Sequence, residues 1–468
     1  MEMLTVKDGQ IVTASGQPVR LRGFNLGGWL NMEDFIDGYV GAEHNLRLNM
    51  SRILGEKKAQ FFFDRLLDYF FTEEDVVFMK GLGANVLRLP FNYRHFERDD
   101  HPFEYLEEGF RRLDQAVEWC GKHGIYVILD FHAVQGWHNP DWHSDNAHVH
   151  ILLYNHPHFQ ERAAALWREI AARFKGNPAV AGFDLMNEPV TRLEYERYDP
   201  SYNNWDGLNI IYRRMAQAIR AVDPDHILFV EGDNFATRYE GLDVTFDPNL
   251  VVSTHNYVTP TVSPGKYPGE FHGKVWDRAA LEAEFRQHSG TRKAFEVGKP
   301  IFAGEFGVWY TGHLDQLSQR VRALDDQLGV FDSAGVHWAI WTLKDIGAMG
   351  SINVAPESEY LQRIAPILKA RQLAADGEGA SVGQKFRETA DAIDRALSDL
   401  GLSFTIERRR FAQFSLFGYL AQFLQVPYAH LFKDCSETEI DRMLSAFAFK
   451  NCVPNQPVVD VLKKHFKA

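Results

Sequence analysis

Two glutamates in this chain follow short apolar stretches and carry side chains suited to acid–base chemistry. Glu188 lies near the end of GFDLMNEPV (residues 182–190), and Glu305 lies within IFAGEFG (residues 301–307). Polar side chains such as an amide and a carboxylate at the end of a buried strand are expected to have a function there. Two carboxyl groups about 5–5.5 Å apart can cleave a glycosidic bond with retention of configuration, one as acid/base and the other as nucleophile. The pair therefore predicts glycoside cleavage, provided that the fold brings the two side chains together.

Other side chains at the ends of apolar stretches suit the same chemistry. Arg88 carries a rigid fork of donors that keeps a carboxylate partner ionised, as a nucleophile requires. Asn187 can hydrogen-bond a sugar hydroxyl, and Trp341 offers a flat apolar face for a sugar ring. Further candidates for substrate binding are Asn25, His132, His255 and Tyr257. Glu231 also ends an apolar stretch, but neither it nor Asn25 is assigned a catalytic role.

Eight short apolar stretches, rich in β-branched and aromatic residues, are typical of parallel strands covered on both faces. They span residues 21–27, 84–90, 126–132, 180–188, 227–232, 250–257, 301–307 and 336–343. Amphipathic helical patterns separate them, such as residues 107–124. Strands alternating with helices predict an α/β protein with a (β/α)8 TIM barrel, in which the loops after the strands surround one pocket. An open doubly wound sheet is the alternative, and it is disfavoured because no GxGxxG follows the first strand.

The chain divides into four predicted parts. Residues 1–20 form a hairpin that plugs the base of the barrel, residues 21–372 form the catalytic barrel, residues 373–383 form a linker, and residues 384–468 form a helical C-terminal extension packed on the barrel. A helix over residues 360–374 can close the ring after the eighth strand, although Pro366 would kink it or shift its start. The basic and aromatic segment 408–427 suggests either a docked helix or membrane-surface contact, and its apolar character favours docking.

The segments NVLRLP, DFH, MNEP, HNY, GEFG and IWTL occur in this order at the ends of predicted strands. Together they resemble glycoside hydrolase family 5, a family of retaining (β/α)8 glycosidases, over about residues 15–370. The resemblance implies that Glu188 is the acid/base and Glu305 the nucleophile. It also implies roles for six further residues: contact with the nucleophile or proximity to the catalytic pair for Arg88, Tyr257 and His255, and binding of the cleaved sugar for His132, Asn187 and Trp341. The opening RGFNLGGWLNMEDF resembles members that act on β-glucans and small β-glucosides, among them exo-1,3-glucanases.

The stretch AVQGWHNPDWHSDNAHVH, after the third predicted strand, is rich in tryptophan and histidine. We expect Trp137, Trp142 and His143 to bind substrate, because sugar sites pair stacking faces with groups that bind hydroxyls. No HExxH or CxxC spacing defines a coordination sphere, so no metal and no cofactor are predicted. The loop NMEDFIDGYVGAE is expected to face this stretch across the pocket. Two long loops at one side of the site favour a closed pocket and exo action.

The composition limits the possible partners. A formal net charge of −13 and a pI of about 5.8 argue against nucleic-acid binding, which needs a basic face. The odd, sparse set Cys120, Cys435 and Cys452 does not resemble a disulfide framework. The start MEMLTVKDGQ lacks the features of a secretion signal, which predicts a cytoplasmic protein.

The sequence thus predicts a glycosidase that hydrolyses O-glycosyl bonds with retention and acts on a carbohydrate substrate. We expect exo action on β-glucosides or short β-gluco-oligosaccharides. A β-mannosidase acting on short oligosaccharides and an endo-acting β-glucanase remain alternatives, because the sequence does not reveal the preferred sugar configuration. A barrel that binds sugars or a lipid surface without catalysis belongs to another class, and the presence of Glu188, Glu305 and Arg88 disfavours it.

Overall fold

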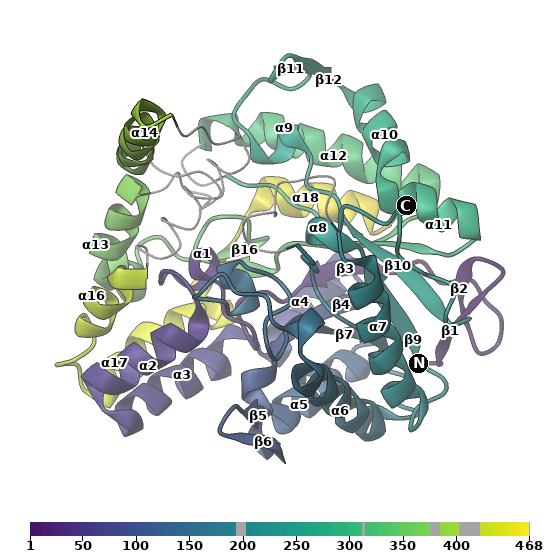
Figure 1. The fold of residues 1–468 in the computed structure, drawn as a ribbon, viewed down its shortest axis with the longest axis horizontal. Helices are drawn as coiled ribbons and strands as arrows, with labels where there is room; N and C mark the ends of the chain where they lie inside the picture. The colour runs from purple at the N-terminus through teal and green to yellow at the C-terminus, as the bar shows by residue number, and fades with distance from the viewer. Residues whose placement is uncertain (193–202, 311–313, 375–383, 402–421, 468) are drawn as a thin grey trace.

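The centre of the molecule is a closed barrel of eight parallel strands, in which each strand pairs with the next along the chain and the last closes onto the first (Figure 1). The computed structural model describes residues 1–192, 203–310, 314–374, 384–401 and 422–467. The predicted TIM barrel and its eight strands are confirmed. The strands are β3 (Arg22–Asn25), β4 (Val86–Asn92), β7 (Tyr126–Ala133), β8 (Val180–Asp184), β9 (Ile227–Glu231), β10 (Leu250–His255), β13 (Ile301–Glu305) and β14 (His337–Ile340).

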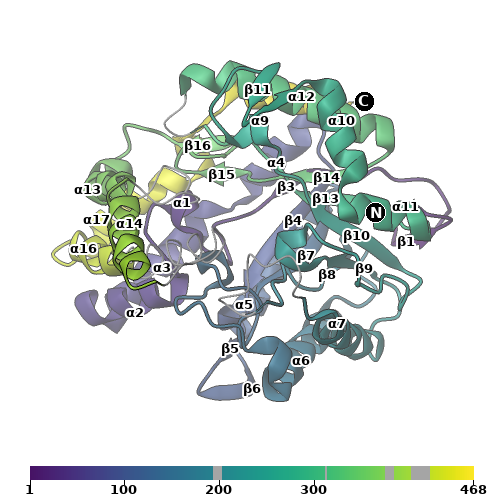
Figure 2. The same ribbon diagram turned by 45° about the horizontal axis from the view of Figure 1, so that its top comes forward.

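Helices cover the outside of the barrel (Figure 2). Each turns one apolar face inward because its apolar residues recur every three or four positions. In α7, for example, the buried residues include Leu208, Ile211, Tyr212, Met215 and Ile219. The covering helices are α4 (Glu73–Leu82), α5 (Glu107–Lys122), α6 (Pro157–Phe174), α7 (Trp205–Arg220), α10 (Arg278–Gln287), α11 (Ser289–Val297) and α12 (Leu317–Ala334).

A β-hairpin closes the base of the barrel, as predicted. It consists of β1 (Leu4–Lys7) and β2 (Gln10–Thr13), which pair antiparallel across a two-residue turn. Both turn residues, Asp8 and Gly9, have positive φ (50° and 73°), as the tightest hairpin turns require. Leu4 and Ile11 pack against apolar residues from the barrel interior, such as Phe229, so the hairpin seals the end opposite the predicted site.

Helices from the two ends of the chain form a side layer (Figures 1 and 2). The long connection between β3 and β4 contributes α1 (Asp34–Asp37), α2 (Glu43–Leu54) and α3 (Glu56–Phe70), and the C-terminal part contributes α16 (Gln425–His430) and α17 (Glu437–Leu444). α16 contacts α2, and α17 contacts α3. The C-terminal part also contains β17 (Cys452–Pro454), which pairs with β16 (Ile352–Val354) beside β15 (Lys344–Asp345). The extension is therefore not purely helical.

The helix that covers the barrel beside its last strand differs from the prediction. α13 (Glu359–Ala374) contains Pro366 without interruption, but it contacts α14 (Gln384–Asp399), α16 and α17. The position between α12 and α4 is taken by α18 (Gln456–His465). Phe466, which follows α18, packs against Trp338 of β14 and Phe24 of β3, with ring centroids 5.0 and 5.5 Å apart. The final helix, distant in sequence, thus completes the ring.

Shorter elements lie in the connections between the barrel strands. The short elements are β5 (Glu97–Arg98), β6 (His101–Tyr105), α8 (Asp233–Ala236), α9 (Thr259–Val262), β11 (Gly269–Phe271) and β12 (Lys274–Trp276). Most of the predicted linker and most of segment 408–427 lie outside the described residues. Among the described helices, none combines the length and the apolar character needed to span a membrane.

Candidate active site

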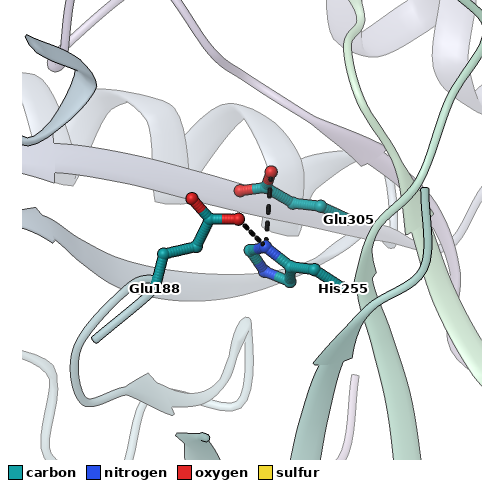
Figure 3. Close-up of side chains that lie close together, drawn as sticks. All are labelled: Glu188, His255 and Glu305. Atoms are coloured by element: carbon teal, nitrogen blue, oxygen red, sulfur yellow. Dashed lines mark hydrogen bonds and ion pairs between the residues drawn. The ribbon is translucent and has the colours of Figure 1, made fainter. Parts of the chain in front are cut away.

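The two candidate catalytic carboxylates meet at the carboxyl ends of the barrel strands. One ligand atom from each of Glu188, His255 and Glu305 can be chosen so that all three lie within 4.8 Å of one another (Figure 3). His255 Nδ1 lies 2.7 Å from Glu188 Oε1 and 3.6 Å from Glu305 Oε2. Glu188 and Glu305 are separated by more than a hundred residues in sequence, yet their carboxyl groups are close enough to act on one anomeric carbon by the retaining mechanism.

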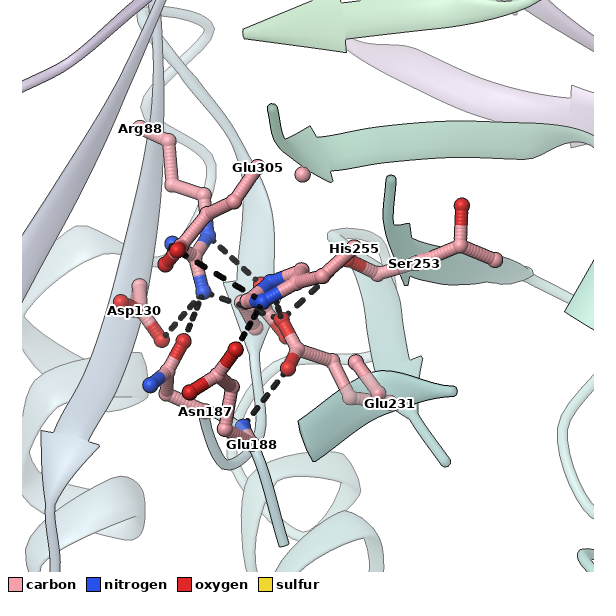
Figure 4. Close-up of polar contacts among 12 residues, drawn as sticks. Arg88, Asp130, Asn187, Glu188, Glu231, Ser253, His255 and Glu305 are labelled. Carbon is pink, nitrogen blue, oxygen red and sulfur yellow. Dashed lines mark hydrogen bonds and ion pairs between the residues drawn. The ribbon is translucent and has the colours of Figure 1, made fainter. Parts of the chain in front are cut away.

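Arg88 lies beneath this pair and is fully buried. Its guanidinium donates to Glu305 Oε1 at 2.8 Å and to Asn187 Oδ1 at 2.8 Å (Figure 4). Asn25 Oδ1 accepts from it at 3.2 Å. Its remaining contacts are three further carboxylates, Asp130 at 3.2 Å, Asp184 at 2.9 Å and Glu231 at 3.0 Å. A single arginine in the barrel interior therefore orients side chains from five of the other seven strands or the loops that follow them.

The contact with Arg88 determines the orientation of Asn187 and, through it, of His132. Because Asn187 Oδ1 accepts from Arg88, the amide nitrogen of Asn187 faces His132 Nε2, 3.2 Å away. The amide nitrogen donates, so His132 Nε2 must be the acceptor. His132 Nδ1 therefore carries the ring hydrogen and donates to Asp130 at 2.7 Å. Burial, and then Arg88, hold the pKa of His132 well below its usual value, which agrees with a neutral ring. The His132 ring stacks on Trp341, with centroids 5.5 Å apart and planes inclined by 12°.

The backbone of Glu188 adopts a conformation that is rare for a residue with a side chain. β8 ends at Asp184, and Glu188 has a φ of 46° in the loop that follows. Its N–H donates to Glu231 Oε2 at 2.7 Å, and its carbonyl accepts from Asn139 Nδ2 at 2.7 Å. The preceding carbonyl, of Asn187, accepts from His138 Nε2 at 2.5 Å. Left-handed backbone of this kind costs about 1–3 kcal/mol and persists only where the surroundings hold it.

A cavity of about 320 Å³ opens above the carboxylates. Polar residues at the catalytic pair and aromatic residues further out line it. The lining residues are Glu33, Phe35, His132, Trp142, His143, Glu188, Tyr257, Val262, Glu305, Trp309, Trp341 and Met349. Phe35 packs against Trp142 and Trp309, with ring centroids 5.9 and 5.1 Å apart. The cavity is at the small end of the range for ligand pockets, about 300–1,000 Å³.

Burial and neighbouring charges set the protonation of the site. Although burial acts in the opposite direction, His255 holds the pKa of Glu188 well below its usual range. Burial also opposes a charged imidazole, but Glu231 and Glu305 hold the pKa of His255 well above its ordinary value. For Glu305, burial raises the pKa, while His255 and Arg88 favour the ionised form. One proton therefore lies in the hydrogen bond between His255 Nδ1 and Glu188 Oε1, and the two groups titrate as a pair.

The structure brings most of the predicted substrate residues to this site. Tyr257 donates to Glu305 Oε2 at 3.0 Å, and His143 Nε2 lies 3.0 Å from Glu188 Oε2. Trp142 and His143 line the cavity, as does Phe35 from the loop after β3, whose ring packs against Trp142.

Five predicted residues do not line the cavity: Arg88, Asn187 and His255 lie around the two carboxylates, and Trp137 and Asn25 take other positions. Trp137 is not among the described residues that line the cavity, because its indole donates to Asp145 O within its own loop. Asn25 lies beneath the site, where its amide donates to Gly304 O and Ala339 O, so it supports the barrel rather than facing the cavity.

Several residues at the site were not assigned a role from the sequence. Charged residues inside apolar strands, Asp130 in β7 and Asp184 in β8, were a visible signal, and so was Glu231 at the end of β9. Glu33 and Trp309 lie in loops and carried no such signal. Burial, and then Glu305, raise the pKa of Glu33 well above its usual value. Glu33 therefore brings a buried carboxyl group to the cavity that can hydrogen-bond a sugar hydroxyl.

The side chains that could hold a metal ion coincide with the candidate catalytic residues. In the described part of the chain, the cluster of close ligand atoms from His, Cys, Asp and Glu is Glu188, His255 and Glu305. His255 already bridges the two carboxylates there, and its protonated form is not a metal ligand. The chemistry of this set favours proton transfer.

Comparisons with known proteins agree with this geometry. The sequence matches the cellulase family, glycosyl hydrolase family 5, over residues 66–347. A β-xylosidase from Phanerodontia chrysosporium is 35% identical, and the match covers 99% of this chain and 98% of that protein. A glucan 1,3-β-glucosidase from Candida oleophila is 26% identical over 58% of this chain and 62% of its own length. The solved structure of endoglucanase Cel5A from Thermotoga maritima shares the fold, with a TM-score of 0.50 and 19% identity over 73% of this chain and 93% of that one.

A TIM barrel with two carboxyl groups over one pocket at the strand ends defines the class of retaining β-glycoside hydrolases. The chain belongs to glycoside hydrolase family 5.

Proposed function

We propose that the protein is an exo-acting β-glycosidase that releases single sugars from β-glucosides or short β-gluco-oligosaccharides, with Glu188 as acid/base and Glu305 as nucleophile. The observation that carries the proposal is the proximity of the two carboxyl groups, bridged by His255, beneath a small cavity. A cavity of about 320 Å³ suits one or two sugar rings, whereas an endo-acting enzyme needs an open cleft.

The reaction proceeds in two displacements. In the first, a Glu305 oxygen attacks the anomeric carbon while Glu188 gives a proton to the glycosidic oxygen, and the alcohol leaves. Arg88 and Tyr257 hydrogen-bond the two oxygens of Glu305 and so fix its direction of attack. In the second displacement, Glu188 takes a proton from water, the water oxygen attacks the same carbon, and the bond to Glu305 breaks. Two inversions give net retention.

The proton for the first step comes from the Glu188–His255 pair. In the free protein this proton is shared across 2.7 Å, and the charges of Glu231 and Glu305 favour its residence on the imidazole. When a sugar fills the cavity and excludes water, transfer along this hydrogen bond supplies the neutral acid that the leaving oxygen needs. No proton has to enter from solvent during the first displacement.

A second candidate substrate is a β-xyloside. It is favoured by the similarity to the β-xylosidase, which extends over nearly the whole of both chains and includes the C-terminal helices. A xylosyl unit differs from a glucosyl unit by the missing hydroxymethyl group, and in a pocket the loss of a single methylene already changes kcat/KM by about 10- to 200-fold. The discrimination is therefore measurable even if both sugars are accepted.

The experiment is a panel of 4-nitrophenyl β-glucoside, β-xyloside, β-mannoside and β-galactoside, together with a short β-glucan oligosaccharide whose products are sized. We expect turnover of the β-glucoside or the β-xyloside and release of monosaccharides from the oligosaccharide. Exclusive turnover of the β-mannoside, or release of oligosaccharides from the chain interior, would overturn the proposal.

A further inference from the structure

Glu231, at the end of β9, is a buried carboxylate that the proposed chemistry uses only through the charge it places beside His255. Its two oxygens make different contacts (Figure 4). Oε1 accepts from Arg88 Nη2 at 3.0 Å and from Ser253 Oγ at 3.3 Å, and it lies 3.1 Å from His255 Nε2. Oε2 accepts from the backbone N–H of Glu188 at 2.7 Å. One side chain therefore touches both members of the pair that supplies the proton.

These contacts determine geometry as well as charge. Because Nε2 of His255 faces Glu231, Nδ1 of the same ring must face Glu188. Because Oε2 accepts the N–H of Glu188, it holds that residue at its φ of 46°, with Asn139 holding the carbonyl on the other side. A carboxylate that orients a histidine toward a reacting group is an effective positioning device, and small misplacements of such groups are costly.

We propose that Glu231 is a positioning residue for general acid catalysis: it fixes the backbone of Glu188 and the ring of His255 so that the acid/base carboxyl group points at the glycosidic oxygen. The inference rests on the proposed role of Glu188. This role can be distinguished from a general effect of charge on Arg88 by comparison with Asp184. Asp184 also pairs with Arg88, at 2.9 Å, but has no hydrogen bond to Glu188 or His255 in the described structure.

The test compares two substrates that differ in their need for a proton. A 2,4-dinitrophenyl glycoside has a leaving group that departs without protonation, whereas an alkyl glycoside needs the acid. kcat/KM reports the first displacement for both. In Glu231→Gln one oxygen becomes an amide nitrogen, so either the N–H of Glu188 or the pair Arg88 and His255 loses its acceptor. Glu231→Asp keeps the charge but shortens the reach, and Asp184→Asn is the matched control for loss of a carboxylate beside Arg88.

We expect Glu231→Gln to lower kcat/KM about 100-fold for the alkyl glycoside and by less than about fivefold for the dinitrophenyl glycoside, as loss of general acid catalysis requires. Glu231→Asp should show the same selectivity with a smaller loss, and Asp184→Asn should leave the ratio of the two substrates within about twofold of wild type. The ratio is independent of the folded fraction, so partial misfolding does not obscure it.

An equal loss for both substrates in the Glu231 variants would overturn the proposal, because Glu231 would then act on the nucleophile or on the fold. A shift of the ratio in Asp184→Asn equal to that in Glu231→Gln would do the same. Absence of turnover of any aryl glycoside by the wild-type protein is a separate outcome, which counts against the proposed function itself.

Discussion

Two buried cations, Arg88 and Lys344, hold different parts of this molecule, and both are fully buried. Lys344 makes three contacts: Asp75 at 2.7 Å, Phe70 O at 2.7 Å and Phe447 O at 2.9 Å. The three N–H donors of its ammonium group thus have three acceptors, and its positive charge is balanced by the single carboxylate of Asp75. Because Phe70 belongs to α3, Asp75 to α4 and Phe447 to the C-terminal extension, this lysine joins the extension to the side layer and to a helix that covers the barrel.

Arg88 has the opposite balance. Four carboxylates lie within 3.2 Å of it: Asp130, Asp184, Glu231 and Glu305. Even with the protonated His255 beside Glu231 and Glu305, two positive charges do not balance four ionised acids in a buried site, so some of these acids hold protons. Burial, and then Glu231, raise the pKa of Asp184 to about 7, and burial raises that of Asp130 well above its usual range. A balanced pair fixes structure, whereas an excess of acid leaves protons that can move.

The largest effect is expected from removing the proposed nucleophile, Glu305. Glu305→Gly should lower kcat by about 10⁴-fold or more, because the first displacement loses its attacking group. Added azide should restore turnover and give the α-glycosyl azide, since a small anion then attacks from the vacated side. The product is identified by NMR. Full activity of Glu305→Gly without azide would contradict its assignment.

Replacing each buried cation by an apolar residue tests the comparison directly. Lys344→Met and Arg88→Met should both destabilise the fold by about 3–5 kcal/mol, the cost of leaving a buried charge unpaired. Their activities should separate them. Lys344→Met should retain wild-type kcat per folded molecule, because its contacts lie away from the cavity, whereas Arg88→Met should lose most activity. Urea unfolding and active-site titration measure the two quantities, and equal losses of kcat would refute the distinction.

The pH profile tests which groups of the cluster around Arg88 are protonated. His255 favours ionisation of Glu305, so its replacement by Gln should raise the pKa of Glu305 and move the acidic limb of kcat/KM to higher pH. We also expect about a 100-fold loss at the optimum from the missing proton partner of Glu188. His337→Gln is the control, because burial lowers the pKa of His337 to about 3 and the residue lies at the start of β14. An acidic limb that stays in place in His255→Gln would contradict the effect of His255 on the pKa of Glu305.

The smallest effect is expected at the tail, where cations are in excess. His465 contacts Asp332 at 2.6 Å and Asp325 at 2.7 Å, and these acids also pair with Arg22 and Lys464. Although burial opposes it, the two acids raise the pKa of His465. Its stabilisation is therefore complete below about pH 6.5, the unfolded value, and is lost as the pH rises through the folded pKa. His465→Gln should cost about 2 kcal/mol at acidic pH and progressively less above neutrality, measured by denaturant unfolding. A cost independent of pH would exclude this linkage.

Different parts of the structure were visible in the sequence to different degrees. The barrel and the pair Glu188 and Glu305 could be predicted, because buried parallel strands read as continuous apolar runs and polar residues at their ends stand out. The convergence of Asp130, Asp184 and Glu231 on Arg88 could not, since it depends on how strands wind around the barrel. The replacement of α13 by α18 in the ring depends on tertiary packing of Phe466, which no local pattern encodes.

The pairing of Glu188 and Glu305 on one anomeric carbon can be tested most directly by trapping the covalent intermediate. A 2-deoxy-2-fluoro-β-glycoside with a dinitrophenyl leaving group, of the sugar that the wild-type protein turns over, slows the second displacement and leaves the sugar bound to the nucleophile. Peptide mass spectrometry should find one sugar per chain, attached to Glu305. Attachment to Glu188, Glu231 or Asp184 instead, or release of product without any covalent species, would contradict the assignment.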